Sequence, residues 1–140
     1  MSPFAWPARV YWEDTDGGGI VYYANYLRFL ERARTEWLRQ RGFSQQRLLA
    51  EEGILFTVVS LEIEYRAAAR LDDELEVSCE PEPQGPASLR FAQRIHRRAA
   101  GGRELLAEAS VRVACLDART MRPRRLPAFL QERAAEEPVR

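Results

Sequence analysis

The sequence predicts an α+β protein in which an antiparallel sheet wraps around one long helix. From Tyr22 to Trp37 apolar residues recur every three to four positions, which is typical of a helix with one apolar stripe. After Gly53 the period changes to two, as in strands that have one buried and one solvated face. A sheet and a helix of this kind bury each other's apolar surface, so we expect one layer of strands against one helix.

The first part of the chain is expected to form a strand, a loop and two helices. Residues 8–14 are rich in β-formers and predict a short strand, which the glycines at 17–19 interrupt. The long helix follows with about twenty residues, and it ends at Gly42, which suits a C-terminal cap. Ser44 is placed to cap a shorter helix over residues 45–52.

Four strands are expected in the second part of the chain. In residues 54–65 glutamates alternate with Leu61, Ile63 and Tyr65, which we expect to face inwards. Three further segments show the same alternation: residues 74–80, 88–97 and 104–116. Turns rich in Pro and Gly separate them, so the strands are expected to pair as hairpins in an antiparallel sheet.

Length and composition are those of an ordinary globular protein. The 140 residues suffice for one core, so we expect a single domain over residues 1–140. The 21 basic residues, all arginine, balance 21 acidic ones, so no overall charge favours nucleic acid. Apolar runs are shorter than a membrane span and the N-terminus lacks a signal-peptide pattern, so we expect a cytoplasmic protein without membrane insertion. Cys79 and Cys115 are expected to be buried thiols.

The sequence lacks the residues that several kinds of catalytic or binding site need. His96 is the single imidazole and is interpreted as a surface residue, so a catalytic triad or a zinc site has no partners for it. The chain has no G-x-S-x-G elbow and no glycine-rich nucleotide loop. A calcium loop beginning at Asp14 would have Gly18 and Asn25 at its fifth and twelfth positions, where oxygen ligands including a bidentate glutamate are required. No metal site is expected.

The candidate site is the stretch EDTDGGG, residues 13–19, which directly precedes the long helix. The first N–H groups of a helix have no intrahelical acceptor, and glycine lets a substrate approach the backbone closely. Such N–H groups stabilise an oxyanion, while Asp16 would attack the polarised carbonyl or activate a water. This suffices for acyl transfer from a thioester. The alternative interpretation is structural, an Asx turn and a helix cap built by Asp14, Thr15 and Asp16.

The segment RVYWEDTDGGGIVYYANYLRFLERARTEWL resembles the signature of the 4-hydroxybenzoyl-CoA thioesterase family, most closely its YbgC-type acyl-CoA thioesterase branch. The likeness continues through GFSQQRLLAEEG, EYRAAARLDDELEV, SLRFAQRI and RPRRLP. The resemblance implies a hotdog fold, with a five-stranded antiparallel sheet wrapped around one long central helix. It also implies hydrolysis of acyl-CoA, or of acyl-carrier-protein thioesters, by a homo-oligomer that is a dimer of dimers, without a metal or a bound organic cofactor.

The resemblance also assigns roles to single residues. The catalytic carboxylate of the family falls on Asp16, as nucleophile or general base, and the backbone N–H that binds the oxyanion falls on Tyr23. The expected substrate-binding residues are Gly19, Tyr26, Val58, Val59 and Ser60. The last three are expected to form a wall of the site in a second subunit, because family active sites lie at a dimer interface.

Some residues depart from the family pattern or have two interpretations. The branch often has histidine at the position of Tyr23 and tyrosine at that of Trp12, so larger aromatics are expected to reshape the acyl pocket. Other hotdog thioesterases have a catalytic carboxylate on the central helix, but helical spacing places Glu31 nearly opposite the apolar stripe, in solvent. Asp72 and Asp73 are expected to form a turn.

Two other interpretations of function and binding stay open. The arginines of residues 119–127 either bind the phosphates of coenzyme A or are solvated. The chain as a whole is either a thioesterase or a binding module that holds an acyl chain or acyl-carrier protein with little turnover. In the second case Asp16→Asn leaves binding unchanged. A hotdog dehydratase is disfavoured because its usual catalytic histidine has no counterpart here.

Overall fold

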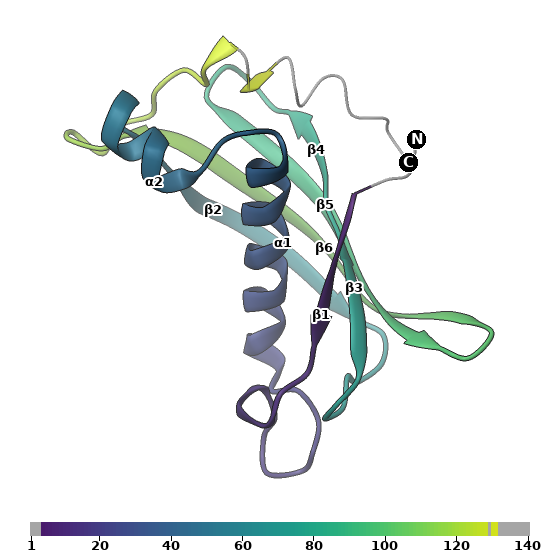
Figure 1. Ribbon diagram of the computed structural model, residues 1–140. Coiled ribbons are helices and arrows are strands. Elements are labelled where there is room, and N and C mark those ends of the chain that lie inside the picture. The colour runs from purple at the N-terminus through teal and green to yellow at the C-terminus, as the bar shows by residue number, and fades with distance from the viewer. Residues whose placement is uncertain (1–3, 129, 132–140) are drawn as a thin grey trace.

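The computed structural model describes residues 4–128, 130 and 131, and these form one antiparallel sheet with a long helix across it (Figure 1). In chain order the elements are β1 (Ala5–Arg9), α1 (Tyr26–Gln40), α2 (Gln45–Arg47), β2 (Ile54–Tyr65), β3 (Glu74–Ser78), β4 (Glu80–Pro83), β5 (Ser88–Ala99) and β6 (Gly102–Asp117). The predicted architecture is confirmed. The expected single domain over residues 1–140 stays a prediction, since its ends lie outside the described residues.

The strands follow the order β1-β3-β5-β6-β2, and β4 pairs with β5 beside this path. The sheet therefore has six strands where five were expected. The predicted strand 74–80 is divided where its pairing with β5 is interrupted, because the Ser78 hydroxyl accepts the Arg94 N–H at 2.9 Å in place of a backbone carbonyl. The next segment pairs with β5 alone, and its Pro81 and Pro83 have no N–H for a second neighbour.

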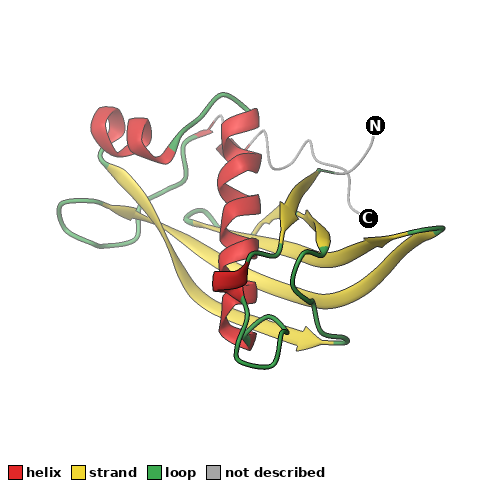
Figure 2. Cartoon of the chain, turned by 60° about the horizontal axis from the view of Figure 1, so that its bottom comes forward, coloured by secondary structure: helices red, strands yellow, loops and turns green. Residues whose placement is uncertain are grey.

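α1 crosses one face of the sheet (Figure 2). It buries one stripe of residues, as its periodicity predicted. The buried residues of this helix are Tyr26, Phe29, Leu30, Ala33, Trp37 and Leu38. The ring of Trp37 packs edge-to-face on Phe91 of β5, with centroids 5.6 Å apart. Fully burying a side chain such as Phe or Leu contributes roughly 1.5–3 kcal/mol, so this stripe holds helix and sheet together. Among the described residues, no helix combines the length and the apolar character that crossing a membrane requires.

Both ends of α1 are set by local hydrogen bonds. The expected cap at Gly42 is confirmed, because this residue has φ +93° and the Phe43 N–H donates to the Leu38 carbonyl at 3.2 Å, which is a Schellman motif. The start was predicted too early, since a 3₁₀ turn at Tyr23–Asn25 precedes the helix. The shorter helix is also confirmed over residues 45–52, partly as a π-turn, and the Ser44 hydroxyl accepts the Arg47 N–H at 3.2 Å.

The strand predicted over residues 8–14 overlaps β1 only at residues 8 and 9, and the prediction is wrong for residues 10–14. β1 ends at Arg9, and the chain enters a 3₁₀ turn at Trp12–Asp14. The physical reason is the side chain of Asp14, whose Oδ2 accepts the Tyr11 N–H at 2.8 Å. A short polar side chain that bonds to nearby backbone competes with a strand ladder.

β2 lies at an edge of the sheet and is less buried than its alternation suggested. Within the described part of the chain it pairs only with β6, and its register shifts between Val58 and Ser60 as in a β-bulge. The prediction that its inward residues are buried is wrong for Leu61 and Tyr65, which are 36% and 43% exposed, whereas Ile63 is partly buried and packs against the core. The backbone of α1 makes its closest sheet contacts with β1 and β3, and it reaches β2 mainly through side chains such as Tyr26, so much of this edge strand stays exposed.

Candidate active site

The acidic glycine loop folds back onto the turn that begins the long helix. Thr15 pairs with Val21 in an antiparallel bridge, and the Asp14 carbonyl accepts the Tyr22 N–H at 3.0 Å. Between them, the Asp16 N–H donates to the Ile20 carbonyl at 2.9 Å. Gly19 has φ +83°, a conformation that glycine adopts without strain. The loop therefore brings Asp16 close to the residues that start α1.

Asp14 is the structural acid of the loop. It is 5% exposed, and besides the Tyr11 N–H on its carboxylate, its carbonyl accepts the side-chain amide of Asn25 at 3.0 Å. These bonds tie the loop to the first turn of the helix. The structural interpretation of the acidic motif thus applies to Asp14.

Asp16 is exposed and its carboxylate is only partly used. Oδ1 accepts the Gly18 N–H at 2.7 Å, which is the bond of an Asx turn. The other carboxylate oxygen has no hydrogen-bond partner among the described residues. A carboxylate that is oriented by one bond and open at its second oxygen suits a nucleophile or a general base. Its catalytic role stays a prediction.

The Tyr23 N–H lies at the start of the 3₁₀ turn Tyr23–Asn25, which runs directly into α1. Within the described part of the chain this N–H has no acceptor. The turn itself is closed by the Asn25 N–H, which donates to the Tyr22 carbonyl at 2.8 Å. An unpaired N–H at the start of a helical turn suits an oxyanion donor, and this role of Tyr23 stays a prediction.

The residues expected to bind substrate lie in different places. Gly19 belongs to the loop, and its carbonyl accepts the Leu71 N–H at 3.3 Å. Tyr26 is 3% exposed, and its hydroxyl accepts the Ala69 N–H at 2.9 Å. Its side chain therefore belongs to the core, and the expected contact with an acyl group stays a prediction.

Val58, Val59 and Ser60 are exposed on β2 and lie far from Tyr23 of the same chain. Tyr65, at the end of this strand, contacts Tyr23, and the three residues precede Tyr65 by five to seven positions. At about 3.3 Å per residue, that is a separation of roughly 16–23 Å. Within one chain these residues do not reach the Asp16 loop.

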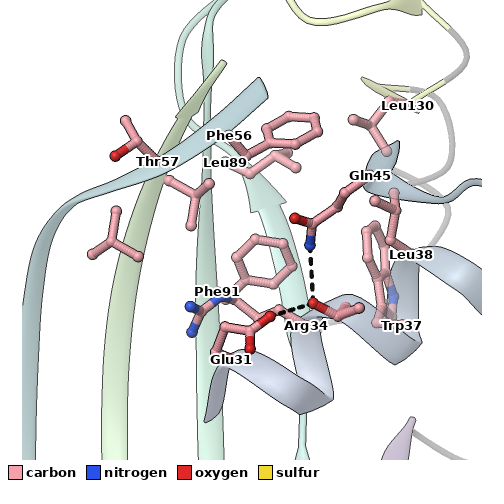
Figure 3. A pocket seen from close by; sticks show the side chains of 13 residues that line it. Glu31, Arg34, Trp37, Leu38, Gln45, Phe56, Thr57, Leu89, Phe91 and Leu130 are labelled. Atoms are coloured by element: carbon pink, nitrogen blue, oxygen red, sulfur yellow. Dashed lines mark hydrogen bonds between the residues drawn. The ribbon is translucent and has the colours of Figure 1, made fainter. Parts of the chain in front are cut away.

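A cavity of about 140 Å³ opens between α1, β2 and β5 (Figure 3). Its walls are mostly apolar and include Phe56, Val58 and Phe91. One side is polar, where Gln45 donates to the Thr35 hydroxyl at 2.9 Å and Thr35 donates to Glu31. Glu31 is exposed as predicted, but it also lines this cavity, which sequence reasoning missed. The lining residues come from distant parts of the chain, so no local pattern signals the cavity.

Beside this cavity lies a polar pair that sequence reasoning also missed. Gln93 is 1% exposed, and its Oε1 accepts the Arg34 guanidinium at 3.0 Å. Its amide nitrogen donates to the carbonyls of Leu30 and Ser78 at 3.1 and 3.3 Å. Burial lowers the pKa of Arg34 from its ordinary value. The alternation of β5 could have indicated this pair, because Gln93 occupies an inward position of the strand between Phe91 and Ile95.

Other residues singled out by the sequence have structural roles. Asp72 adopts φ +71° in the expected turn, and the Asp73 carboxylate accepts the Arg97 guanidinium at 2.8 Å. Arg124 of the arginine run donates to the Glu52 carbonyl at 2.7 Å. Cys79 and Cys115 are buried free thiols, as predicted, and burial raises the pKa of both. No group of three or more His, Cys, Asp or Glu side chains converges within the described residues in a way that could hold a metal ion.

Known proteins are similar to this chain in sequence and in fold. Residues 10–134 match the thioesterase-like superfamily. The acyl-CoA thioester hydrolase YbgC of Escherichia coli O157:H7 is 52% identical over 124 residues, covering 89% of this chain and 90% of that protein. A probable thioesterase from Bartonella henselae has a TM-score of 0.81 at 35% identity, covering 90% of this chain and 100% of the other. A 4-hydroxybenzoyl-CoA thioesterase complexed with 4-hydroxybenzoyl-CoA has a TM-score of 0.86 at 23% identity, covering 94% and 98%.

The fold and these matches place the chain in the class of hotdog thioesterases, in which a sheet curves around one long helix. The chain belongs to the thioesterase-like superfamily. The expectations of family and fold are thus confirmed.

Proposed function

We propose that this protein hydrolyses acyl-CoA thioesters to a free acid and coenzyme A. The proposal rests on two groups that the folded loop and turn bring into one region. One is the Asp16 carboxylate, which has one oxygen without a hydrogen-bond partner among the described residues, and the other is the unpaired Tyr23 N–H. The 52% identity to a YbgC acyl-CoA thioester hydrolase supports the same reaction. Thioesters of acyl-carrier protein are a second substrate class with the same reacting bond.

In the proposed reaction the thioester oxygen accepts the Tyr23 N–H, and negative charge develops on that oxygen as the carbonyl carbon is attacked. If Asp16 acts as general base, it takes a proton from the attacking water, the new C–O bond forms, and the C–S bond breaks. The proton then passes to the leaving thiolate. If Asp16 attacks directly, its oxygen bonds to the acyl carbon as the C–S bond breaks, and the thiolate leaves and takes a proton from water. Water then hydrolyses the resulting anhydride to the free acid and the Asp16 carboxylate, and trapping this anhydride distinguishes the two routes.

A second copy of the chain is proposed to complete the site. The outer edge of β2 has no partner strand among the described residues, and Val59 on it is 49% exposed. Unpaired, apolar strand edges pair readily with another strand. The residues Val58, Val59 and Ser60, which do not reach their own Asp16 loop, would then face that of the partner. We propose a homo-oligomer of this kind, assembled as a dimer of dimers, in the cytoplasm.

The acyl group is proposed to enter the cavity beside Val58. An apolar cavity of about 150 Å³ holds one benzene ring, so the 140 Å³ found here suits a short chain or an aromatic ring. The polar side at Glu31 and Thr35 would lie near the mouth of this pocket.

The test measures thiol release from short, long and aromatic acyl-CoAs with the wild type and Asp16→Asn. We expect the variant to lose at least about a hundredfold in kcat/KM, which corresponds to roughly 2.7 kcal/mol of transition-state stabilisation. Glu13→Gln is the matched control, because it removes an exposed carboxylate from the same loop. Equal activity of wild type and Asp16→Asn contradicts the proposed role.

A binding module is the second candidate, because the Asp16–Gly18 bond is also that of an ordinary Asx turn. It predicts negligible turnover of every thioester by the wild type, together with unchanged binding of acyl-CoA or acyl-carrier protein by Asp16→Asn. Thiol release by the wild type distinguishes it from the hydrolase, and calorimetric titration of both proteins measures the binding.

A further inference from the structure

Tyr65, the last residue of β2, contacts the turn that carries the proposed oxyanion donor. Its hydroxyl donates to the Tyr23 carbonyl at 2.8 Å, across 42 positions of sequence. Its ring lies edge-to-face with Tyr26 and Tyr23, with centroids 5.1 and 6.5 Å apart. Partial burial raises the pKa of Tyr65, so the phenol stays a neutral donor. The hydroxyl takes part in none of the proposed reaction steps, and the side chain is 43% exposed, so it lies outside the core.

The bonded carbonyl belongs to the residue whose N–H is proposed to bind the oxyanion. In a helical turn the N–H and the C=O of one residue point in opposite directions along the axis. These two groups lie in successive peptide planes that meet at the Tyr23 Cα, so holding the Tyr23 carbonyl restricts the backbone dihedrals of Tyr23 and, through them, the direction of its N–H. On the other side, Asp14 holds the same turn through the Tyr22 N–H and the Asn25 side chain. The turn is thus fixed from two directions by residues that are distant from each other in sequence.

We infer that Tyr65 is a positioning residue for the Tyr23 N–H, acting through the hydrogen bond of its hydroxyl to the Tyr23 carbonyl. The inference rests on the proposed hydrolase function for its kinetic consequence. A preorganised donor stabilises the oxyanion of the transition state more than the neutral carbonyl of the substrate. Loss of the hydroxyl therefore lowers kcat and leaves KM nearly unchanged.

The kinetic test is Tyr65→Phe, which keeps the stacked ring and removes the hydroxyl. A neutral hydrogen bond contributes about 0.5–1.5 kcal/mol, so we expect kcat to fall about threefold to tenfold on the best acyl-CoA. Tyr11→Phe is the control, because it removes a phenol hydroxyl from an exposed ring outside the turn. Unchanged kcat in Tyr65→Phe overturns the inference. A variant that loses stability and substrate binding to the same extent as it loses kcat also overturns it, because that result indicates a merely structural role.

A second measurement does not depend on turnover. Hydrogen exchange of the Asn25 amide reports how firmly the 3₁₀ turn is closed, because this N–H bonds to the Tyr22 carbonyl. In Tyr65→Phe its protection should fall about threefold to tenfold, while that of Ala33 within α1 stays constant. Unchanged Asn25 protection refutes the positioning role. A wild type without thioesterase activity refutes the proposed function instead, and Asn25 exchange still decides whether Tyr65 holds the turn.

Discussion

Replacing Gln93 by leucine tests how much a buried polar pair contributes to stability. The change keeps a similar volume but removes the amide, so the bond from Arg34 and the two bonds to the Leu30 and Ser78 carbonyls are lost together. The surroundings stay closed to water, because Gln93 is 1% exposed. Arg34 then keeps a charge in a partly buried place without this acceptor.

The expected cost follows from these contacts. A hydrogen bond to a charged group contributes about 1.5–3 kcal/mol, and the two weaker bonds about 1 kcal/mol each. The added apolar burial of leucine offsets roughly 1–2 kcal/mol of this sum. We expect Gln93→Leu to lower the free energy of unfolding by about 3 kcal/mol, and Tm by about 10 °C for a chain of this length.

Urea unfolding followed by fluorescence measures this loss, with Gln84→Leu as a control on an exposed turn. The control should change stability by less than about 0.5 kcal/mol. Because the two side chains interact, Arg34→Met and Gln93→Leu together should cost at least about 1 kcal/mol less than the sum of their separate effects. Strict additivity, or a loss below about 1 kcal/mol for Gln93→Leu, would refute the reasoning.

Three further predictions concern pH, the loop and assembly. Desolvation, and then Arg103, lowers the pKa of His96 below 6.5, so the unfolded chain binds more protons just below that pH. Stability should therefore fall as pH drops from 6.5 towards the folded pKa, and His96→Gln should flatten this slope in urea titrations at several pH values. Asp14→Ala should lower the free energy of unfolding by about 1–3 kcal/mol because it leaves the Tyr11 N–H unpaired, whereas a loss below about 0.5 kcal/mol would contradict its structural role. Val59→Asp places a charge on the open edge of β2 and should shift the mass measured by light scattering to that of a monomer, and an unchanged oligomer would show that this edge is not the interface.

The sequence predicted the features that depend on neighbouring residues. The apolar stripe of α1, its cap at Gly42 and the cap at Ser44 follow from spacing and side-chain chemistry within one or two turns. The acidic motif pointed to the loop at the start of the helix, although its local pattern did not separate the structural Asp14 from the open Asp16.

Tertiary structure decided which strands are edges and which distant side chains meet. The alternation of β2 predicted burial for Leu61 and Tyr65, but the strand order places β2 at an edge of the sheet, where both side chains are partly exposed. Tyr65 instead reaches Tyr23, 42 positions away, and Gln93 reaches Arg34, 59 positions away. Periodicity shows which face of an element is apolar. It does not show what covers that face, because sheet order and register are set by the summed packing of residues far apart in the chain.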